Sequence, residues 1–206
     1  MAAALPHRGG RGFGFLAAAV FVALVAVAFG GGAHAQDKAV PIKDPENTVY
    51  LDILYGRVVI ELRADLAPKT VERFKQLVRE KFYDGLTFHR VLPAFMAQTG
   101  DPKGDGTGGS GQTLPAEFSK EKHTRGTVSM ARSAKDPNSA DSQFFIVIRE
   151  SNELDGKYTI FGRVIDGMDH VDRIKKGSKA IDGRVVVNPD KIKQMRIAAD
   201  VAGKKS

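Results

Sequence analysis

Short alternating runs of apolar and polar residues, broken by turns and by only two helical stretches, constrain the fold of this chain most strongly. Eight such runs occur, at residues 49–53, 58–62, 87–91, 95–98, 126–131, 142–148, 160–165 and 191–199. The helical stretches begin at Pro68 and at Gly167, and the second ends at Lys175. Because strands and helices do not alternate regularly, a sheet built from β-α-β units is not expected. The pattern predicts an all-β-dominated domain, a closed antiparallel sheet capped by two helices.

The first 35 residues have the composition of a secretory signal peptide. Arg8 and Arg11 give a basic start, residues 13–29 carry no charge, and Ala33 and Ala35 frame a small-residue cleavage signal. The apolar run is slightly long for a signal peptide, so an uncleaved membrane anchor through residues 13–29 is the alternative. Both interpretations predict that the domain is exported.

The remaining chain divides into three parts by composition. Residues 36–46 form a polar, proline-containing linker, residues 47–200 carry the predicted strands and helices, and residues 201–206 form a flexible tail.

The charge balance favours a solvated basic surface over a dedicated nucleic-acid or membrane patch. The net charge of +7 falls to +5 without residues 1–35, which hold two arginines and no acid. The surplus is spread along the chain without a basic run of five or six residues. The chain has no cysteine, which excludes disulfides, thiolate nucleophiles and thiolate metal sites.

The glycine-rich stretch 101–112 is predicted to be a long turn whose backbone lines a peptide groove. Gly104, Gly106 and Gly109 match G-x-G-x-x-G, but no helix is expected to begin at the last glycine, as a dinucleotide site requires. A phosphate-binding loop is excluded as well, because Ser110 stands where such a loop needs a lysine.

Other common catalytic constellations are missing from the sequence. The histidines of the domain stand singly, without the spacing of metal ligands: His89, His123 and His170. No serine has the context of a nucleophile elbow, and no close pair of carboxylates suits glycoside hydrolysis. The sequence therefore predicts neither a metal nor a cofactor.

The stretch 88–101 places one guanidinium, Arg90, near two large apolar side chains and an amide. It is predicted to form two extended pieces separated by Pro93. Alternation along the second piece puts Phe95 on the face of Ala97, and Met96 on the face of Gln98. An arginine beside an apolar patch suits a reaction that needs neither a nucleophile nor a proton relay, such as rotation of the peptide bond before proline.

Five motifs resemble the cyclophilins, which are prolyl isomerases built on an eight-stranded antiparallel barrel with two capping helices. The motifs are FHRVLPAFMAQTGD (88–101), GDGTGG (104–109), GTVSMAR (126–132), SQFFIVI (142–148) and LDGKYTIFGRV (154–164). They follow the family's order and spacing across essentially all of residues 47–200. With the export segment, the chain resembles bacterial periplasmic members.

The resemblance implies a set of site residues. Arg90 takes the place of the catalytic arginine, and Gln98 that of the amide which orients it. The proline-ring pocket is expected from Phe95, Met96, Phe145, Leu154 and Tyr158, and the surrounding groove from His89, Gly106, Ala131, Arg132 and Gln143.

Four positions depart from the family pattern. Arg132 stands where many members have asparagine, and Ser133 replaces an alanine. Tyr158 replaces a histidine of the pocket wall, and its ring is expected to cover the proline still. Glu153 replaces the tryptophan of cyclosporin-sensitive members, which predicts weak cyclosporin binding.

The partners implied are unfolded or extended proline-containing polypeptides, and the sequence gives no pattern that calls for an oligomer, so a monomer is expected. Two other hypotheses stay open at this stage. The same groove could hold proline-containing segments without catalysis, as a chaperone does. A nucleic-acid binder would show affinity that falls steeply with salt.

Overall fold

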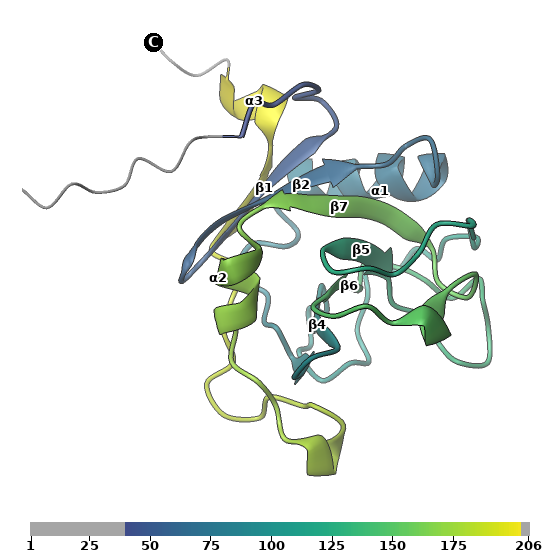
Figure 1. Cartoon of the computed structure of the whole chain (residues 1–206), viewed down its shortest axis with the longest axis vertical. Coiled ribbons are helices and arrows are strands. Elements are labelled where there is room, and N and C mark those ends of the chain that lie inside the picture. The colour runs from purple at the N-terminus through teal and green to yellow at the C-terminus, as the bar shows by residue number, and fades with distance from the viewer. Residues whose placement is uncertain (1–39, 203–206) are drawn as a thin grey trace, which may run out of the picture. The chain divides into compact units, whose positions relative to one another are not determined.

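A computed structural model describes residues 40–202, which contain one eight-stranded antiparallel sheet (Figure 1). The strands are β1 Thr48–Ile53, β2 Gly56–Leu62, β3 Arg90–Leu92, β4 Met96–Thr99, β5 Thr127–Met130, β6 Phe144–Val147, β7 Ile160–Asp166 and β8 Gln194–Ile197. The helices are α1 Pro68–Arg79, α2 Met168–Arg173 and α3 Ala198–Ala202, with 3-10 turns η1 Asn152–Leu154 and η2 Lys179–Ile181. The eight predicted strands are thus confirmed, with β3, β5, β6 and β8 shorter than predicted.

The sheet is curled, with strand order β3-β4-β6-β5-β7-β2-β1-β8. The predicted closure is not made by a regular strand pair, because β3 and β8 form the two edges of this order. Instead, the segment before β3 is joined to the segment before β8 by backbone hydrogen bonds. Phe88 N donates to Asp190 O at 2.9 Å, and Ile192 N donates to Leu86 O at 2.9 Å. Pro189, directly before Asp190, has no N–H and cannot donate a further hydrogen bond between these two segments.

The main core lies between the sheet and α1, which packs against β7 and β8. The predicted apolar stripe of α1 is confirmed, because Val71, Phe74, Leu77 and Val78 are buried. The ring centroid of Phe74 lies 4.8 Å from that of Phe161 and 5.3 Å from that of Phe144. These aromatic contacts fix α1 against β6 and β7, the strands that lead to the site.

The N-terminus of α1 is capped by a carboxylate that lies far away in sequence. Glu117 accepts hydrogen bonds from Lys69 N at 3.1 Å and from Thr70 N at 2.9 Å. Two helix N–H groups without a partner in the helix are satisfied, and a negative charge sits at the positive end of the helix dipole.

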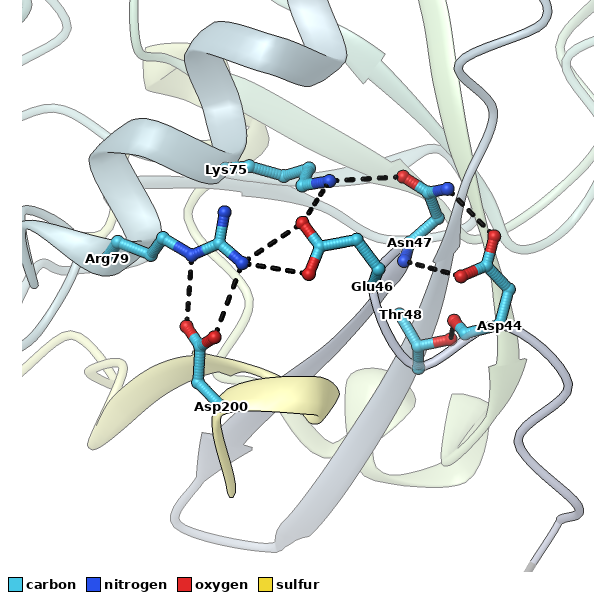
Figure 2. Close-up of polar contacts among 7 residues, drawn as sticks. All are labelled: Asp44, Glu46, Asn47, Thr48, Lys75, Arg79 and Asp200. Atoms are coloured by element: carbon cyan, nitrogen blue, oxygen red, sulfur yellow. Dashed lines mark hydrogen bonds and ion pairs between the residues drawn. The ribbon is translucent and has the colours of Figure 1, made fainter. Parts of the chain in front are cut away.

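The C-terminal segment differs from the prediction of a strand to residue 199 followed by a tail. The chain leaves β8 at Ile197 and forms α3, in which three of five residues are alanine, the strongest helix former. Arg79 of α1 binds Asp200 of α3 at 3.1 Å and Glu46 at 2.9 Å, and Lys75 lies 2.6 Å from Glu46 (Figure 2). The last residues of the predicted linker are therefore already tied to the domain.

The predicted signal segment 1–35 and the tail residues 203–206 lie outside the described residues. Within residues 40–202, every helix is too short or too polar to span a membrane.

Candidate active site

Nine predicted site residues meet around one cavity of 220 Å³ beside β4 and β6. They are Arg90, Phe95, Met96, Gln98, Ala131, Arg132, Phe145, Leu154 and Tyr158. Among these lining residues there is no histidine, aspartate or glutamate. A larger hollow of 740 Å³ runs along the outer face of α1, but it holds none of the predicted site residues. We place the candidate site at the smaller cavity because most of the predicted site residues line it, including Arg90 beside apolar side chains.

The cavity floor is a small apolar cluster separate from the main core. Met96, Phe145, Val147 and Leu154 form it, each 8% exposed or less. Phe144 and Ile146 point instead into the main core. The alternation predicted for this strand is confirmed, and it gives β6 one face for stability and one for the site.

Phe95 joins Met96 at the cavity, and the prediction that it shares a face with Ala97 is wrong. Ala97 is fully buried in the main core, whereas Phe95 packs against the cavity cluster. The regular strand begins only at Met96, and Ala94 before it has a positive φ of 56°. The turn therefore redirects the Phe95 side chain, so strand alternation does not apply to it.

Arg90 and Gln98 face each other across the β3–β4 pair. Arg90 Nη1 donates to Gln98 Oε1 at 3.2 Å and lies 4.0 Å from Met96 Sδ. The opposite edge of the guanidinium contacts Asp182. No periodicity or motif in the sequence marks Asp182, which lies 92 residues further along the chain.

A chain of amides connects Arg90 to the glycine-rich loop. Gln98 Nε2 donates to Gln143 Oε1 at 2.9 Å. Gln143 Nε2 in turn donates to the carbonyls of Gly106 at 3.1 Å and Gly108 at 2.8 Å. Each amide uses both ends, so the loop and the arginine are held in one hydrogen-bonded row.

Two carboxylates hold the glycine-rich loop from within. Asp101, 1% exposed, accepts from Lys103 N and Gly106 N at 2.8 and 2.5 Å. A Cβ at Gly108 would lie 2.1 Å from Asp101 Oδ1, and one at Gly109 would lie 2.4 Å from Asp141 Oδ2. These glycines therefore make room for carboxylates rather than for a pyrophosphate, in keeping with the predicted turn.

This loop forms the wall of a second cavity of 320 Å³, which adjoins the first. Gln98, Ala131 and Arg132 line both cavities. The predicted groove residues Gly106 and Gln143 line the second one. Its walls also include Thr107, Gly108, Ser133, Ser139 and Asp141. A chain seated in the first cavity would meet a polar neighbouring site.

The side chain of Arg132 takes part in the cavity wall. Its guanidinium carbon lies 4.8 Å from the centre of the Tyr158 ring. Its Nε donates to Lys157 O at 2.9 Å, and its Nη1 to Ser133 O at 2.8 Å. The two departures from the family pattern, Arg132 and Tyr158, thus support each other as a stacked pair.

His89 does not line either cavity, contrary to the prediction for this residue. It is 4% exposed, and both ring nitrogens are buried without a hydrogen-bond partner among the described residues. His89 directly precedes β3, and strand alternation puts it on the side of the buried Val91 while Arg90 faces the cavity.

Three polar residues from separate parts of the sequence form a hydrogen-bonded row behind the cavity. His123 Nδ1 lies 3.1 Å from Asp155 Oδ1, and its Nε2 lies 3.0 Å from Ser129 Oγ. The His123 ring stacks on Phe145 at 6.3 Å between centroids. Both Ser129 and His123 are fully buried, and only the Asp155 end of the row reaches solvent, where it pairs with Lys122 at 3.0 Å. The row therefore supports the cavity wall from behind.

We expect acid to destabilise the domain through His123. Burial lowers the pKa of His123 below 6.5, more than its hydrogen bond to Asp155 raises it. The neutral ring is therefore favoured in the folded state, so stability is complete above pH 6.5 and is lost as the pH falls. The pKa of Asp155 is lowered to about 2, and the largest cause is the hydrogen bond from the backbone N–H of His123. The stability that this carboxylate contributes is therefore lost only as the pH falls below 3.8.

Urea unfolding at pH 7.5, 6.0 and 5.0 measures this effect. The free energy of unfolding should fall from pH 7.5 to pH 5.0. In His123→Gln this free energy should depend less on pH, whatever its value at pH 7.5. An unchanged slope in His123→Gln would contradict the assignment to this residue.

Comparisons with known proteins agree with the geometry. Residues 48–197 match the family model described as cyclophilin type peptidyl-prolyl cis-trans isomerase. A probable peptidyl-prolyl cis-trans isomerase of Brucella suis biovar 1 is 54% identical over 197 residues, which cover 90% of this chain and 95% of that protein. Peptidyl-prolyl cis-trans isomerase B of Bacillus subtilis is 43% identical over 132 residues, covering 63% of this chain and 91% of that protein.

Solved structures give the same result. A crystal structure of a cyclophilin type peptidyl-prolyl cis-trans isomerase from Cryptosporidium parvum, in the presence of the dipeptide Ala-Pro, superposes with a TM-score of 0.66. It is 32% identical and covers 73% of this chain and 98% of that one. The sequence motifs, the curled sheet, the arginine-bearing apolar cavity and these relatives lead to one assignment: this chain belongs to the cyclophilin family of peptidyl-prolyl cis-trans isomerases.

Proposed function

We propose that this isomerase is exported and acts on unfolded or extended proline-containing polypeptides, and that Arg90, at the 220 Å³ cavity, promotes rotation of the prolyl bond. The observation that carries the proposal is the position of the guanidinium. Arg90 is held by Gln98 at the rim of an apolar hollow formed by Phe95, Met96 and Phe145. A proline ring fits such walls, and its nitrogen would then lie near a donor that stays charged at every working pH.

The donor acts on the transition state because of how an amide twists. Rotation destroys amide resonance, which gives an uncatalysed barrier of ~18–20 kcal/mol. In the twisted state the proline nitrogen recovers a lone pair that an N–H of Arg90 can bind, whereas the planar ground state offers none. This interaction is therefore stronger in the transition state, as catalysis requires.

One donor is not sufficient for a large acceleration. A 10⁵-fold rate increase needs about 7 kcal/mol, and one preorganised donor supplies roughly 3–4 kcal/mol. The remainder is assigned to desolvation of the amide against the apolar walls and to holding the flanking residues in the adjoining polar cavity. The activity test is acceleration of cis-to-trans conversion of an X-Pro peptide by purified residues 36–206. No acceleration would overturn the proposal.

Export is proposed from the basic start, the apolar run 13–29 and the small residues before Gln36. A mature protein that begins at Gln36 in the periplasmic fraction of a bacterial host is the expected result, checked by mass spectrometry. A protein that keeps residue 1 and sediments with membranes would support the anchored alternative. A cytoplasmic full-length protein would contradict export.

Cyclosporin is expected to bind weakly. Glu153 is exposed on η1, next to the cavity residue Leu154, and stands where cyclosporin-sensitive members have tryptophan. Glu153→Trp should tighten inhibition by cyclosporin at least tenfold, because burying an indole ring against the inhibitor contributes roughly 1.5–3 kcal/mol of binding free energy. Tight inhibition of the unaltered protein, or no gain in Glu153→Trp, would contradict this assignment.

A further inference from the structure

The loop between α2 and β8 places a carboxylate at the outer edge of the catalytic guanidinium. Arg90 Nη2 donates to Asp182 Oδ1 at 2.9 Å, and Arg90 Nε donates to Asp182 Oδ2 at 3.1 Å. The same Nε also donates to the Asp182 backbone oxygen at 3.0 Å. From this contact we propose that Asp182 is a positioning residue for the isomerase reaction, one that fixes the plane of the Arg90 guanidinium. The inference rests on the role of Arg90 proposed above.

The backbone around Asp182 is fixed to the edge strand that carries Arg90. Val91 N donates to Gly183 O at 2.8 Å, and Gly177 N donates to Val91 O at 2.9 Å. The loop is thus hydrogen-bonded to the edge strand β3 at residues before and after Asp182. Its place relative to Arg90 is set by main-chain bonds and does not depend on a flexible side chain alone.

The turn at Asp182 has a conformation that few residues adopt. Asp182 ends η2 with φ 54° and ψ 40°, the left-handed region in which aspartate is enriched among non-glycine residues. Gly183 follows with φ 74°, and a Cβ there would lie 2.6 Å from Leu92 Cγ. The Asp-Gly pair therefore allows the loop to approach β3 closely enough for the carboxylate to reach Arg90.

The remaining donors of Arg90 fit a substrate-facing role. A guanidinium has five N–H groups. Asp182 takes the Nε–H and one hydrogen of Nη2, and Gln98 takes one hydrogen of Nη1. One N–H on Nη2 is left over from these bonds, and the second N–H of Nη1 has only the weak acceptor Met96 Sδ, at 4.0 Å. With both edges held, the group cannot rotate about its Cδ–Nε bond without breaking charge-assisted bonds.

Because the Arg90–Asp182 pair is exposed to solvent, its effect on the reaction can be distinguished from its effect on the stability of the fold. The Asp182 side chain is 75% exposed and that of Arg90 is 27% exposed. Ion pairs this open to water stabilise folded proteins little. Loss of the Asp182 carboxylate should therefore change the reaction more than the unfolding midpoint.

The test compares Asp182→Ala and Asp182→Glu with a control pair remote from the cavity. Asp182→Ala should lower kcat/KM about tenfold, mainly through kcat, because misplaced catalytic groups lose rate without losing the binding surface. Asp182→Glu should recover part of the loss. The control Asp172→Ala breaks a comparable pair with Arg125, of 2.6 and 2.8 Å, and should change kcat/KM less than twofold.

A double-mutant cycle shows whether Asp182 acts through Arg90. In an Arg90→Ala background, Asp182→Ala should cause no further loss of rate. In NMR spectra, the Arg90 Nε–H should exchange with water faster in Asp182→Ala than in the unaltered protein, because only the backbone oxygen of residue 182 then accepts from it. Unchanged kcat/KM in Asp182→Ala, or an equal loss with and without Arg90, would overturn the proposal. An unaltered protein that fails to accelerate isomerisation would instead overturn the role of the whole site.

Discussion

Arg90→Ala should lower kcat/KM for an X-Pro peptide by about 10²- to 10³-fold, the usual cost of removing one preorganised transition-state donor. The cavity walls keep their shape in this variant, because Phe95, Met96 and Phe145 do not depend on the guanidinium for burial. The expected loss therefore lies in kcat. Coupled protease or NMR line-shape measurements of the cis-to-trans rate check it.

Two variants make the result specific to a guanidinium at this position. Arg90→Lys keeps the charge but loses the planar fork, so most of the loss should remain. Arg125→Ala removes an arginine that also pairs with an aspartate, Asp172, but away from the cavity, and its rate should match that of the unaltered protein. Arg90→Ala retaining more than about a third of kcat/KM would contradict a barrier contribution of several kcal/mol.

Neighbouring phenylalanines on β6 should give opposite results when each is changed to alanine. Phe144 is fully buried in the main core, where it contacts Phe74, Tyr83 and Phe161 edge to face. Phe144→Ala should lower the free energy of unfolding by about 3–5 kcal/mol. The fraction that remains folded should keep its kcat/KM, because Phe144 does not reach the cavity.

Phe145→Ala should lower kcat/KM roughly ten- to a hundredfold, since an apolar wall of this size contributes about 1.5–3 kcal/mol to holding the proline ring. Its effect on unfolding should be smaller than that of Phe144→Ala, because the truncation widens an existing open cavity and leaves no dry void in the core. Urea unfolding and peptide kinetics on both variants provide the comparison. Equal losses of stability, or full activity in Phe145→Ala, would contradict the division of β6 into two faces.

The sequence predicts the cavity walls well because they follow local rules. Alternation along β6 separates Phe144 from Phe145, and the helical spacing at Val71 and Phe74 predicts the face of α1 that is buried. The cyclophilin motifs then group residues that lie far apart in sequence, such as Met96 and Leu154, around one cavity.

Features that depend on contacts between irregular segments are not predictable in this way. Asp182 reaches Arg90 from a loop with no periodicity, through a turn that its own left-handed backbone makes possible. The row of Asp155, His123 and Ser129 joins residues from three separate segments. The resemblance to the cyclophilins implies a groove position for His89, but neighbours in an extended chain point to opposite sides, so His89 faces away from the cavity that Arg90 lines.

We propose that the groove speeds rotation of the prolyl bond through Arg90 and does not merely hold proline-containing segments. The most direct measurement is NMR exchange between the cis and trans forms of an X-Pro peptide, with peptide binding followed in the same samples. We expect rapid exchange with the unaltered protein. With Arg90→Ala we expect peptide affinity within a few-fold of that of the unaltered protein, but exchange close to the uncatalysed rate. Peptide binding without faster exchange by the unaltered protein, or equal exchange by both proteins, would contradict this proposal.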